Sequence, residues 1–147
     1  MAKDTTVGMV LHDVARMMRR DFDRRARSAG LSRERWQVLW HLSRHEGIHQ
    51  AALAELLDVA PISLARQLDR LEEEGLVQRR ADPGDRRRCL LYLTEAATPA
   101  LESLRGKAAQ TRQRALDGLT VEDVEALQRV LETMRSNLSD RNPEEGE

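Results

Sequence analysis

The fold is decided by residues 50–93, which read QAALAELLDVAPISLARQLDRLEEEGLVQRRADPGDRRRCLLYL. Residues 50–57 and 61–74 each have the apolar spacing of a short helix, and residues 58–60 form a tight turn between them. Pro61 suits the first position of the second helix, because the N–H that proline lacks is one that a helix start leaves unpaired. This pattern predicts a helix-turn-helix.

A β-hairpin is predicted directly after the second helix. Residues 77–80, which begin with Val77, and residues 89–93, which are rich in apolar side chains, are short enough to be strands. The turn between them contains Asp82-Pro83-Gly84-Asp85, in which proline presets φ and glycine permits a positive φ. Residues 86–88 are all arginine, so the tip of the hairpin carries a concentrated positive charge.

The helix over residues 61–74 has an outer side suited to DNA. Its inner side is apolar and consists of Leu64, Leu68 and Leu71. The opposite side is polar and consists of Ser63, Arg66, Gln67 and Arg70. Arginine can donate two hydrogen bonds to guanine in the major groove, glutamine can pair with adenine, and serine can bond phosphate or a base edge. Taken alone, this stripe fits an ordinary solvated helix face equally well.

The arginines of the hairpin favour DNA binding over a solvated charged turn. Three guanidinium groups on a short, stiff turn are well placed to enter a minor groove, whose negative potential attracts them. Asp85 beside Arg86 then makes sense if its carboxylate orients that guanidinium by a charge-assisted hydrogen bond. A helix for the major groove and a hairpin for the minor groove together predict a DNA-binding protein.

Amphipathic helices are predicted on both sides of this lobe, over residues 7–29, 32–45, 94–118 and 120–139. The last of them carries an apolar seam with steps of 3 or 4, formed by Val124, Leu127, Leu131, Met134 and Leu138. This seam could pack inside its own subunit. Because the central lobe already pairs its own apolar faces, we expect the terminal helices to form a homodimer instead. Such a dimer would read a roughly palindromic site with half-sites about one DNA turn apart.

The composition fits one globular domain. The 147 residues are 40% apolar and 33% charged, which suits a single soluble domain. Residues 16–27 hold six arginines against two aspartates, so a local basic surface can bind phosphate although the net charge is only -1. Cys89 is the only cysteine, which excludes an internal disulfide and leaves packing as its expected role. Without a leader or a run of roughly 18 apolar residues, we expect a cytoplasmic protein with no membrane partner.

The central residues resemble the MarR family of winged helix-turn-helix regulators. The resemblance is carried by residues 50–57, by Ser63-Leu64-Ala65-Arg66, by residues 71–77, and by the wing Asp82-Pro83-Gly84-Asp85-Arg86-Arg87 that leads into Leu93-Thr94. Similarity to the SlyA branch extends through residues 31–36 and into the helix after Thr94, where Pro99 also fits, so it covers nearly the whole chain. The wing motif is specific, whereas a bare helix-turn-helix pattern is not.

The resemblance implies a mainly α-helical fold with a small β-hairpin wing, in a single domain of residues 1–147. Residues 32–93 would form the DNA-binding lobe, and residues 7–29 and 95–139 would be the dimerisation helices. The protein would be a homodimeric transcription regulator, acting chiefly as a repressor, that binds double-stranded DNA.

The implied DNA contacts come from the helix and from the wing. Ser63, Arg66 and Arg70 would contact DNA from the helix, with Gln67 beside them, while Pro61 and Ile62 would lie near the backbone or a thymine methyl. Arg86 would be the wing-tip residue, oriented by Asp85 and accompanied by Arg87.

A ligand pocket is a further expectation. Trp36 and Trp40 are four residues apart and share one side of a helix, where such pairs usually belong to the core. Similarity to the family implies that they could instead line a pocket for a small aromatic carboxylate, with Arg16 pairing with the anion.

Other chemistries find little support in the sequence. His41, His45 and His49 have a spacing that metal sites use, but Gly47 should end the helix before His49 and no acid or cysteine cluster joins them. We therefore expect neither metal nor cofactor. Without a clustered nucleophile and base or a glycine-rich phosphate loop, we expect no enzymatic activity. The remaining alternative is a helical adaptor that binds protein and has no specific DNA site.

Overall fold

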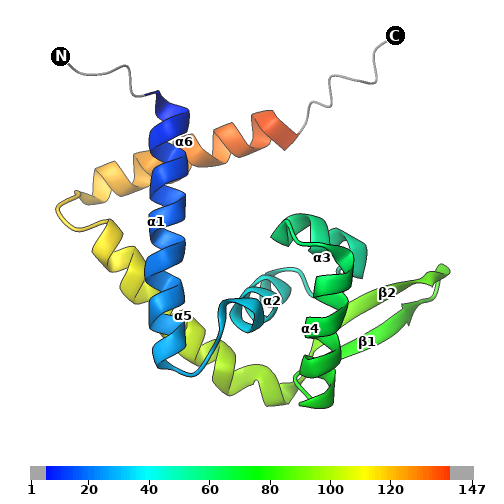
Figure 1. Cartoon of the computed structure of the whole chain (residues 1–147). Helices are drawn as coiled ribbons and strands as arrows, with labels where there is room; N and C mark the ends of the chain where they lie inside the picture. Colours follow the sequence, from blue (N-terminus) through cyan, green and yellow to red (C-terminus); the bar gives the residue numbers. More distant parts are fainter. Residues whose placement is uncertain (1–5, 140–147) are drawn as a thin grey trace, which may run out of the picture. The chain divides into compact units, whose positions relative to one another are not determined.

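The computed structural model describes residues 6–139 and divides into two compact units, the first ending at Thr111 and the second beginning at Arg112. Its elements, labelled in Figure 1, are in chain order α1 (Val7–Ser28), α2 (Arg33–Arg44), α3 (Gln50–Leu57), α4 (Pro61–Glu73), β1 (Val77–Asp82), β2 (Asp85–Leu93), the short 3-10 helix η1 (Glu95–Ala97), α5 (Thr98–Ala115) and α6 (Val121–Ser139). The predicted mainly helical fold with one hairpin is confirmed. In the described part of the chain, no helix combines the length and apolarity needed to cross a bilayer.

The helix boundaries follow local signals. Thr6 caps α1, because its Oγ1 accepts a hydrogen bond from the backbone N–H of Met9 at 3.3 Å. Pro61 occupies the first turn of α4, as predicted. Asp58 ends α3 in the left-handed conformation with φ of 53°, which aspartate tolerates better than most residues. The tight turn between α3 and α4 therefore depends on this residue.

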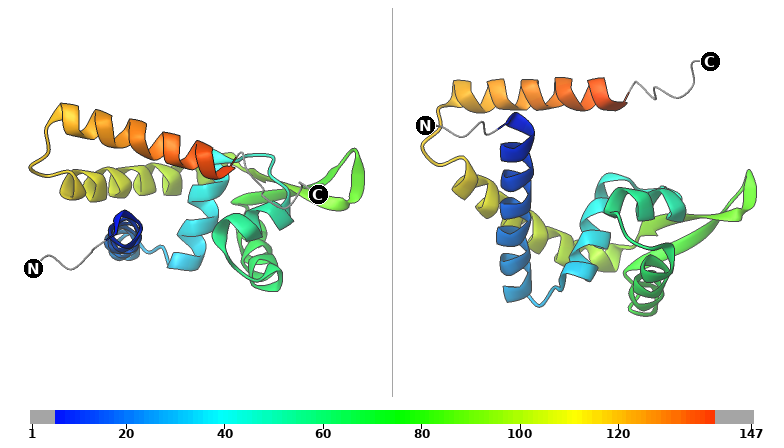
Figure 2. Two further views of the ribbon diagram at one scale, coloured as in Figure 1. Left: turned by 90° about the horizontal axis from the view of Figure 1, so that it is seen from above. Right: turned by 45° about the horizontal axis from the view of Figure 1, so that its top comes forward.

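The hairpin is longer than its sequence pattern indicated. The strands were expected over residues 77–80 and 89–93, but β1 continues to Asp82 and β2 begins at Asp85, so only Pro83 and Gly84 separate them. In β2, apolar content marked only the half of the strand that packs on the helices, and in β1 only Val77 is buried. The other half extends past α3 and α4 into solvent, as Figure 2 shows, and polar residues suffice there.

A third backbone segment joins the hairpin. The backbone N–H of Gly47 donates to the Leu91 carbonyl at 2.8 Å, the N–H of Leu91 donates to the Ile48 carbonyl at 3.0 Å, and His49 forms an isolated antiparallel bridge with Leu90. This pairing ties the segment before α3 to β2. It was not predicted, because it involves too few residues to leave an alternating apolar pattern.

The core of the first unit is formed mainly by leucines. Its largest fully buried side chains are Val38, Leu39, Leu42, Leu53, Leu64, Leu68, Leu71, Val77, Leu91 and Leu104. They come from α2, α3, α4, both strands and α5, so the hairpin and α4 share one hydrophobic core. Leu56, three residues after the fully buried Leu53, is 46% exposed, because Leu53 and Ala54 fill the inner side of this short helix.

Polar contacts attach the C-terminal half of α1 to its neighbours. The buried Asp21 accepts hydrogen bonds from Arg25 Nε of the same helix and from Thr111 Oγ1 of α5, each at 2.8 Å. The buried Asp23 accepts one from Trp36 Nε1 of α2 at 2.9 Å. Because a buried carboxylate needs such partners, these contacts fix α1 against α2 and against the part of α5 within the first unit.

Candidate nucleic-acid interface

The outer side of α4 is exposed along its length. Four of the predicted contact residues on α4 are exposed, namely Pro61, Ser63, Arg66 and Arg70. Ile62, in the first turn, is 64% exposed. Gln67 is half-buried, because it lies three residues after Leu64 and four before Leu71, both buried, and thus at the edge of the inner stripe.

Gln67 and Arg70 open onto a hollow of about 240 Å³ between α4 and the start of α2. Ser32, Glu34, Arg35 and Leu71 complete its lining. Gln67 therefore lies beside the first turn of α2 rather than fully on the outer side of α4. A nucleic acid on this face would meet the start of α2 as well as α4.

Arg79 of β1 ties the wing to α4. Its guanidinium donates to Oδ1 of Asp69 at 2.6 Å and to the Ala65 carbonyl at 2.9 Å, and its backbone N–H donates to Oε2 of Glu72 at 3.1 Å. At the end of the helix, Arg35 of α2 forms a bidentate ion pair with Glu74. The contacts of Arg79 set the angle between the hairpin and α4, and the Arg35–Glu74 pair attaches the end of α4 to α2. Arg79 was not predicted to have this role, because the sequence indicates the contact only through the opposite charges of Arg79 and Asp69.

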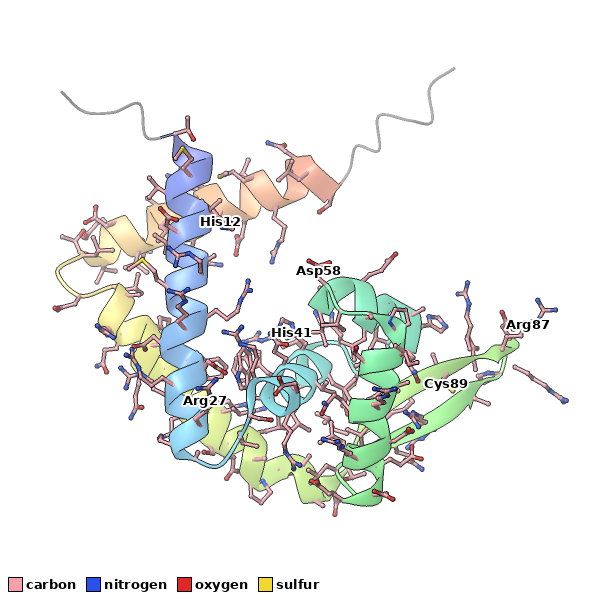
Figure 3. All side chains as sticks on the ribbon, in the orientation of Figure 1. His12, Arg27, His41, Asp58, Arg87 and Cys89 are labelled. Carbon is pink, nitrogen blue, oxygen red and sulfur yellow. The ribbon has the colours of Figure 1, made fainter. Side chains whose placement is uncertain are left out.

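The wing arginines lie on a strand and not on the turn itself. The register pairs Asp82 with Asp85 but Ala81 with Cys89, so Arg86, Arg87 and Arg88 form an irregular bulge of β2 without ladder partners on β1. All three arginines are exposed. Figure 3 shows Arg87 at the outer end of the hairpin.

Asp85 contacts other groups than expected. Its Oδ1 accepts the backbone N–H of Arg87 at 3.0 Å, and its Oδ2 lies 3.7 Å from Nε of Arg88. The predicted bond from Asp85 to the Arg86 guanidinium is therefore wrong. An aspartate readily accepts the N–H two residues on, whereas the next side chain along a strand points to the opposite face.

Six arginines of the candidate interface differ in whether they form ion pairs. The guanidinium groups of Arg35 and Arg79 are held in ion pairs. Within residues 6–139, no ion pair is formed by Arg66 or Arg70 of α4, or by Arg86 or Arg87 of β2. Because they need not break an ion pair first, the latter four can bind phosphate or base edges directly.

A groove of about 500 Å³ lies between the candidate residues at the start of α4 and those of the wing. Arg87, Arg88 and Cys89 line it from β2, and Pro61 lines it from the start of α4. Its remaining lining residues come from α3 and its N-cap, and they are His49, Gln50, Ala51, Ala52 and Glu55. The structure thus brings the helix and wing candidates to one surface around one shared core.

The expected ligand residues are arranged differently. Trp36 is 4% exposed, its ring centroid lies 4.6 Å from that of Phe22, and its indole N–H is bound to Asp23. These contacts favour the core interpretation. Trp40 is half-buried, with the Arg44 guanidinium 5.2 Å from its ring centroid. The Arg16 guanidinium pairs with Asp13 of its own helix at 3.5 Å.

The histidines and Cys89 have separate surroundings. Burial, together with the charges of His45, Arg19 and Arg44, lowers the pKa of His41. His49 instead contacts Asp82, with Nε2 2.8 Å from Oδ2. In the described residues, no three His, Cys, Asp or Glu side chains form a group that could hold a metal ion. Cys89 is half-buried on β2 and is a free thiol.

Comparison with known proteins finds several that share this arrangement. Residues 31–89 match the MarR family. The crystal structure of the transcriptional regulator PA3341 is 37% identical, with a TM-score of 0.78 over 92% of this chain and 100% of that one. Apo MarR from E. coli is 25% identical, with a TM-score of 0.75 over 90% of this chain and 98% of that one. A mutant MarR from E. coli in complex with operator DNA is 26% identical, with a TM-score of 0.67 over 87% and 92% of the two chains.

Proposed function

This chain belongs to the MarR family, and we propose that it is a homodimeric transcription regulator that binds a pseudo-palindromic DNA site. The observation that carries the proposal is the joint exposure, on α4 and on the wing of one lobe, of arginines that form no ion pair within residues 6–139. The similar MarR from E. coli in complex with operator DNA supports double-stranded DNA as the partner. On this proposal α4 enters the major groove and the hairpin reaches the adjacent minor groove.

The dimer would be built from the terminal helices, over residues 7–29 and 95–139, with the DNA-binding lobe over residues 32–93. The first half of α1 exposes a large apolar surface, including Val7, Met9, Val10, Leu11 and Val14. On α6, Leu127, Val130 and Leu138 are likewise exposed. Apolar surfaces of this kind are typical of protein interfaces. A second copy would cover them and align two copies of α4 with two half-sites.

The proposal also covers whether the protein represses or activates transcription and which small molecule controls it. We infer that the protein is cytoplasmic and represses transcription by occupying DNA near a promoter. We also infer that it belongs to the SlyA-like branch. A small aromatic carboxylate would modulate DNA affinity from a pocket near the half-buried Trp40, with Arg16 as its counter-charge. Tryptophan fluorescence titrated with salicylate-like compounds tests this part. The similar structures named above are regulators, and we propose no enzymatic activity.

DNA selection tests the central proposal. Genomic fragments bound by the purified protein would be sequenced, and the affinity for the selected duplex measured at several salt concentrations. We expect a palindromic site and a steep loss of affinity with salt, because phosphate contacts release counterions. A protein-binding adaptor would select no fragment over random duplex.

Removal of the Arg66 side chain should weaken specific binding. We expect Arg66→Ala to cost about 1–3 kcal/mol, or roughly 5–150-fold in affinity for the selected duplex, because a bidentate base contact is lost. The matched control is Arg44→Ala, which removes an exposed arginine of α2 in the same lobe. Equal affinities of the two variants in a fluorescence anisotropy titration would contradict the assignment of α4 as the reading helix.

The wing should contribute to DNA affinity through contacts of its arginines with phosphates and with the negative potential of the minor groove. We expect Arg86→Ala to weaken binding of selected and random duplexes alike, and to make the slope of log affinity against log salt shallower by about 1. The measurement is anisotropy from low to moderate salt. An unchanged affinity at moderate salt would show that Arg86 makes no DNA contact, and Arg87→Ala, measured in parallel, tests its neighbour.

A further inference from the structure

His49 lies where three parts of the interface meet. It is the N-cap residue of α3, its backbone pairs with Leu90 of β2, and its imidazole contacts Asp82 of β1. Nε2 of His49 lies 2.8 Å from Oδ2 of Asp82. A single residue therefore contacts both strands of the wing and also begins the helix that precedes α4.

The side chain of His49 is not used for helix capping. An N-cap position usually holds a small polar residue whose side chain accepts a hydrogen bond from the first turn. His49 makes no such bond. Its imidazole is turned to the hairpin instead, so this position stabilises a contact between two elements rather than the start of its own helix.

The contact reaches the hairpin where the strand ladder changes register. Ala81 pairs with Cys89 and Asp82 with Asp85, which leaves the three intervening arginines without ladder partners. Near the tip the two strands are therefore joined by fewer ladder pairs, and the side chain of Asp82 makes further bonds there. Its Oδ1 accepts the backbone N–H of Gly84 at 2.9 Å, while its Oδ2 faces His49. The carboxylate thus joins the turn of the wing to the start of α3.

The surrounding charges define how this contact depends on pH. His49 shares its groove with Arg87 and Arg88 of β2 and with Glu55 of α3, and it faces Asp82 of β1. The hydrogen bond from His49, followed by that from Gly84, lowers the pKa of Asp82, so the carboxylate is ionised at neutral pH. A protonated imidazole forms an ion pair with it, whereas a neutral one keeps only a weaker hydrogen bond.

We propose that His49 is a positioning residue for DNA binding, which holds the wing tip through Asp82 so that the arginines of β2 meet the DNA, and holds it more firmly when protonated. This inference rests on the proposed function. The sign follows from the charges: an imidazolium and a carboxylate attract each other more strongly than a neutral imidazole and a carboxylate, so DNA affinity should be higher at acidic pH than at alkaline pH.

The test is a pH profile of affinity for the selected duplex at fixed salt, using the full-length protein. Wild type should lose roughly five- to tenfold in affinity between about pH 5.5 and pH 8, the difference between a charged and a neutral hydrogen bond. His49→Gln keeps a donor but cannot titrate, so its profile should be flatter and its affinity should match wild type only at high pH. His45→Gln, at an exposed histidine of the same lobe, should retain the wild-type profile.

Asp82→Asn separates positioning from direct phosphate contact by His49. If His49 acts through Asp82, this variant lowers affinity, flattens the profile, and adds nothing further when combined with His49→Ala. If His49 only supplies positive charge to DNA, removing the Asp82 carboxylate raises affinity and leaves the profile unchanged, which would overturn the proposal. Amide exchange in residues 85–89 should also become faster in both single variants, and circular dichroism confirms that each is folded.

Failure of this inference is distinguishable from failure of the proposed function. If wild type selects no duplex, the DNA-binding proposal itself fails. If wild type binds its selected duplex but the His49 and Asp82 variants match it at every pH, only the positioning role is wrong.

Discussion

Leu127→Arg should convert the proposed homodimer to monomers and reduce affinity for the proposed palindromic duplex by about 10²–10⁴-fold. Leu127 is 43% exposed on α6, in the predicted apolar seam, so an arginine there would not disrupt the core of its own unit. In a dimer it would bring a charge into an apolar interface, and two subunits that no longer associate lose the gain in affinity that linkage of two binding modules provides, on the order of 10²–10⁴. Sedimentation analysis and anisotropy measure the two effects.

The control for this variant is Thr133→Arg. It introduces the same side chain at an exposed position of the same helix, but six residues on, where about 100° per residue places it far from the seam. We expect Thr133→Arg to remain dimeric with wild-type affinity. A dimeric Leu127→Arg protein would show that the seam of α6 is not the interface, while leaving the DNA contacts of the lobe untouched.

Leu68→Ala should lower the free energy of unfolding by about 2–5 kcal/mol, the usual range for a fully buried leucine. Leu68 is fully buried, at 0% exposure, on the inner side of α4. Its loss removes apolar contact from the core that α4 shares with the hairpin and leaves a cavity there. Denaturant unfolding at one protein concentration measures the change, because the stability of a dimer depends on concentration.

Ile62→Ala is the matched control for Leu68→Ala. Both changes remove a branched aliphatic side chain from α4, but Ile62 is exposed and should change stability by no more than about 0.5 kcal/mol. If Ile62 lies against a thymine methyl, its loss lowers DNA affinity without lowering stability. A Leu68→Ala protein as stable as Ile62→Ala would contradict the assignment of Leu68 to the core.

Local patterns predicted the helical elements well. The steps of three and four residues in α1, α2, α4 and α6 describe one helix face each, and such periodicity is a property of a short stretch of chain. Pro83 and Gly84 likewise predicted the turn of the hairpin, because turn preferences also act within a few residues. The first and last residues of the strands were less well predicted. Both β1 and β2 are longer than expected, because a strand that projects into solvent does not require apolar side chains.

Contacts between distant residues could not be predicted in the same way. Asp85 was expected to bind Arg86, its neighbour in sequence, but binds the backbone of Arg87 and approaches Arg88. Arg79 appeared to be one more basic residue of the hairpin, yet its guanidinium is bound to α4. Charge composition shows that partners exist, but which charges meet depends on how strands and helices pack.

The sequence alone thus determined the type and order of the elements and most of the polar residues on the outer side of α4, since these follow from the spacing of side chains along one helix or one turn. Tertiary structure decided which arginines of the described chain are held in ion pairs, that Trp36 belongs to the core, and that His49 contacts Asp82, 33 positions away. The physical reason is the distance along the chain over which each interaction acts. Helix periodicity acts over a few residues, whereas a hydrogen bond between the start of α3 and β1 exists only after the shared core has brought the two together.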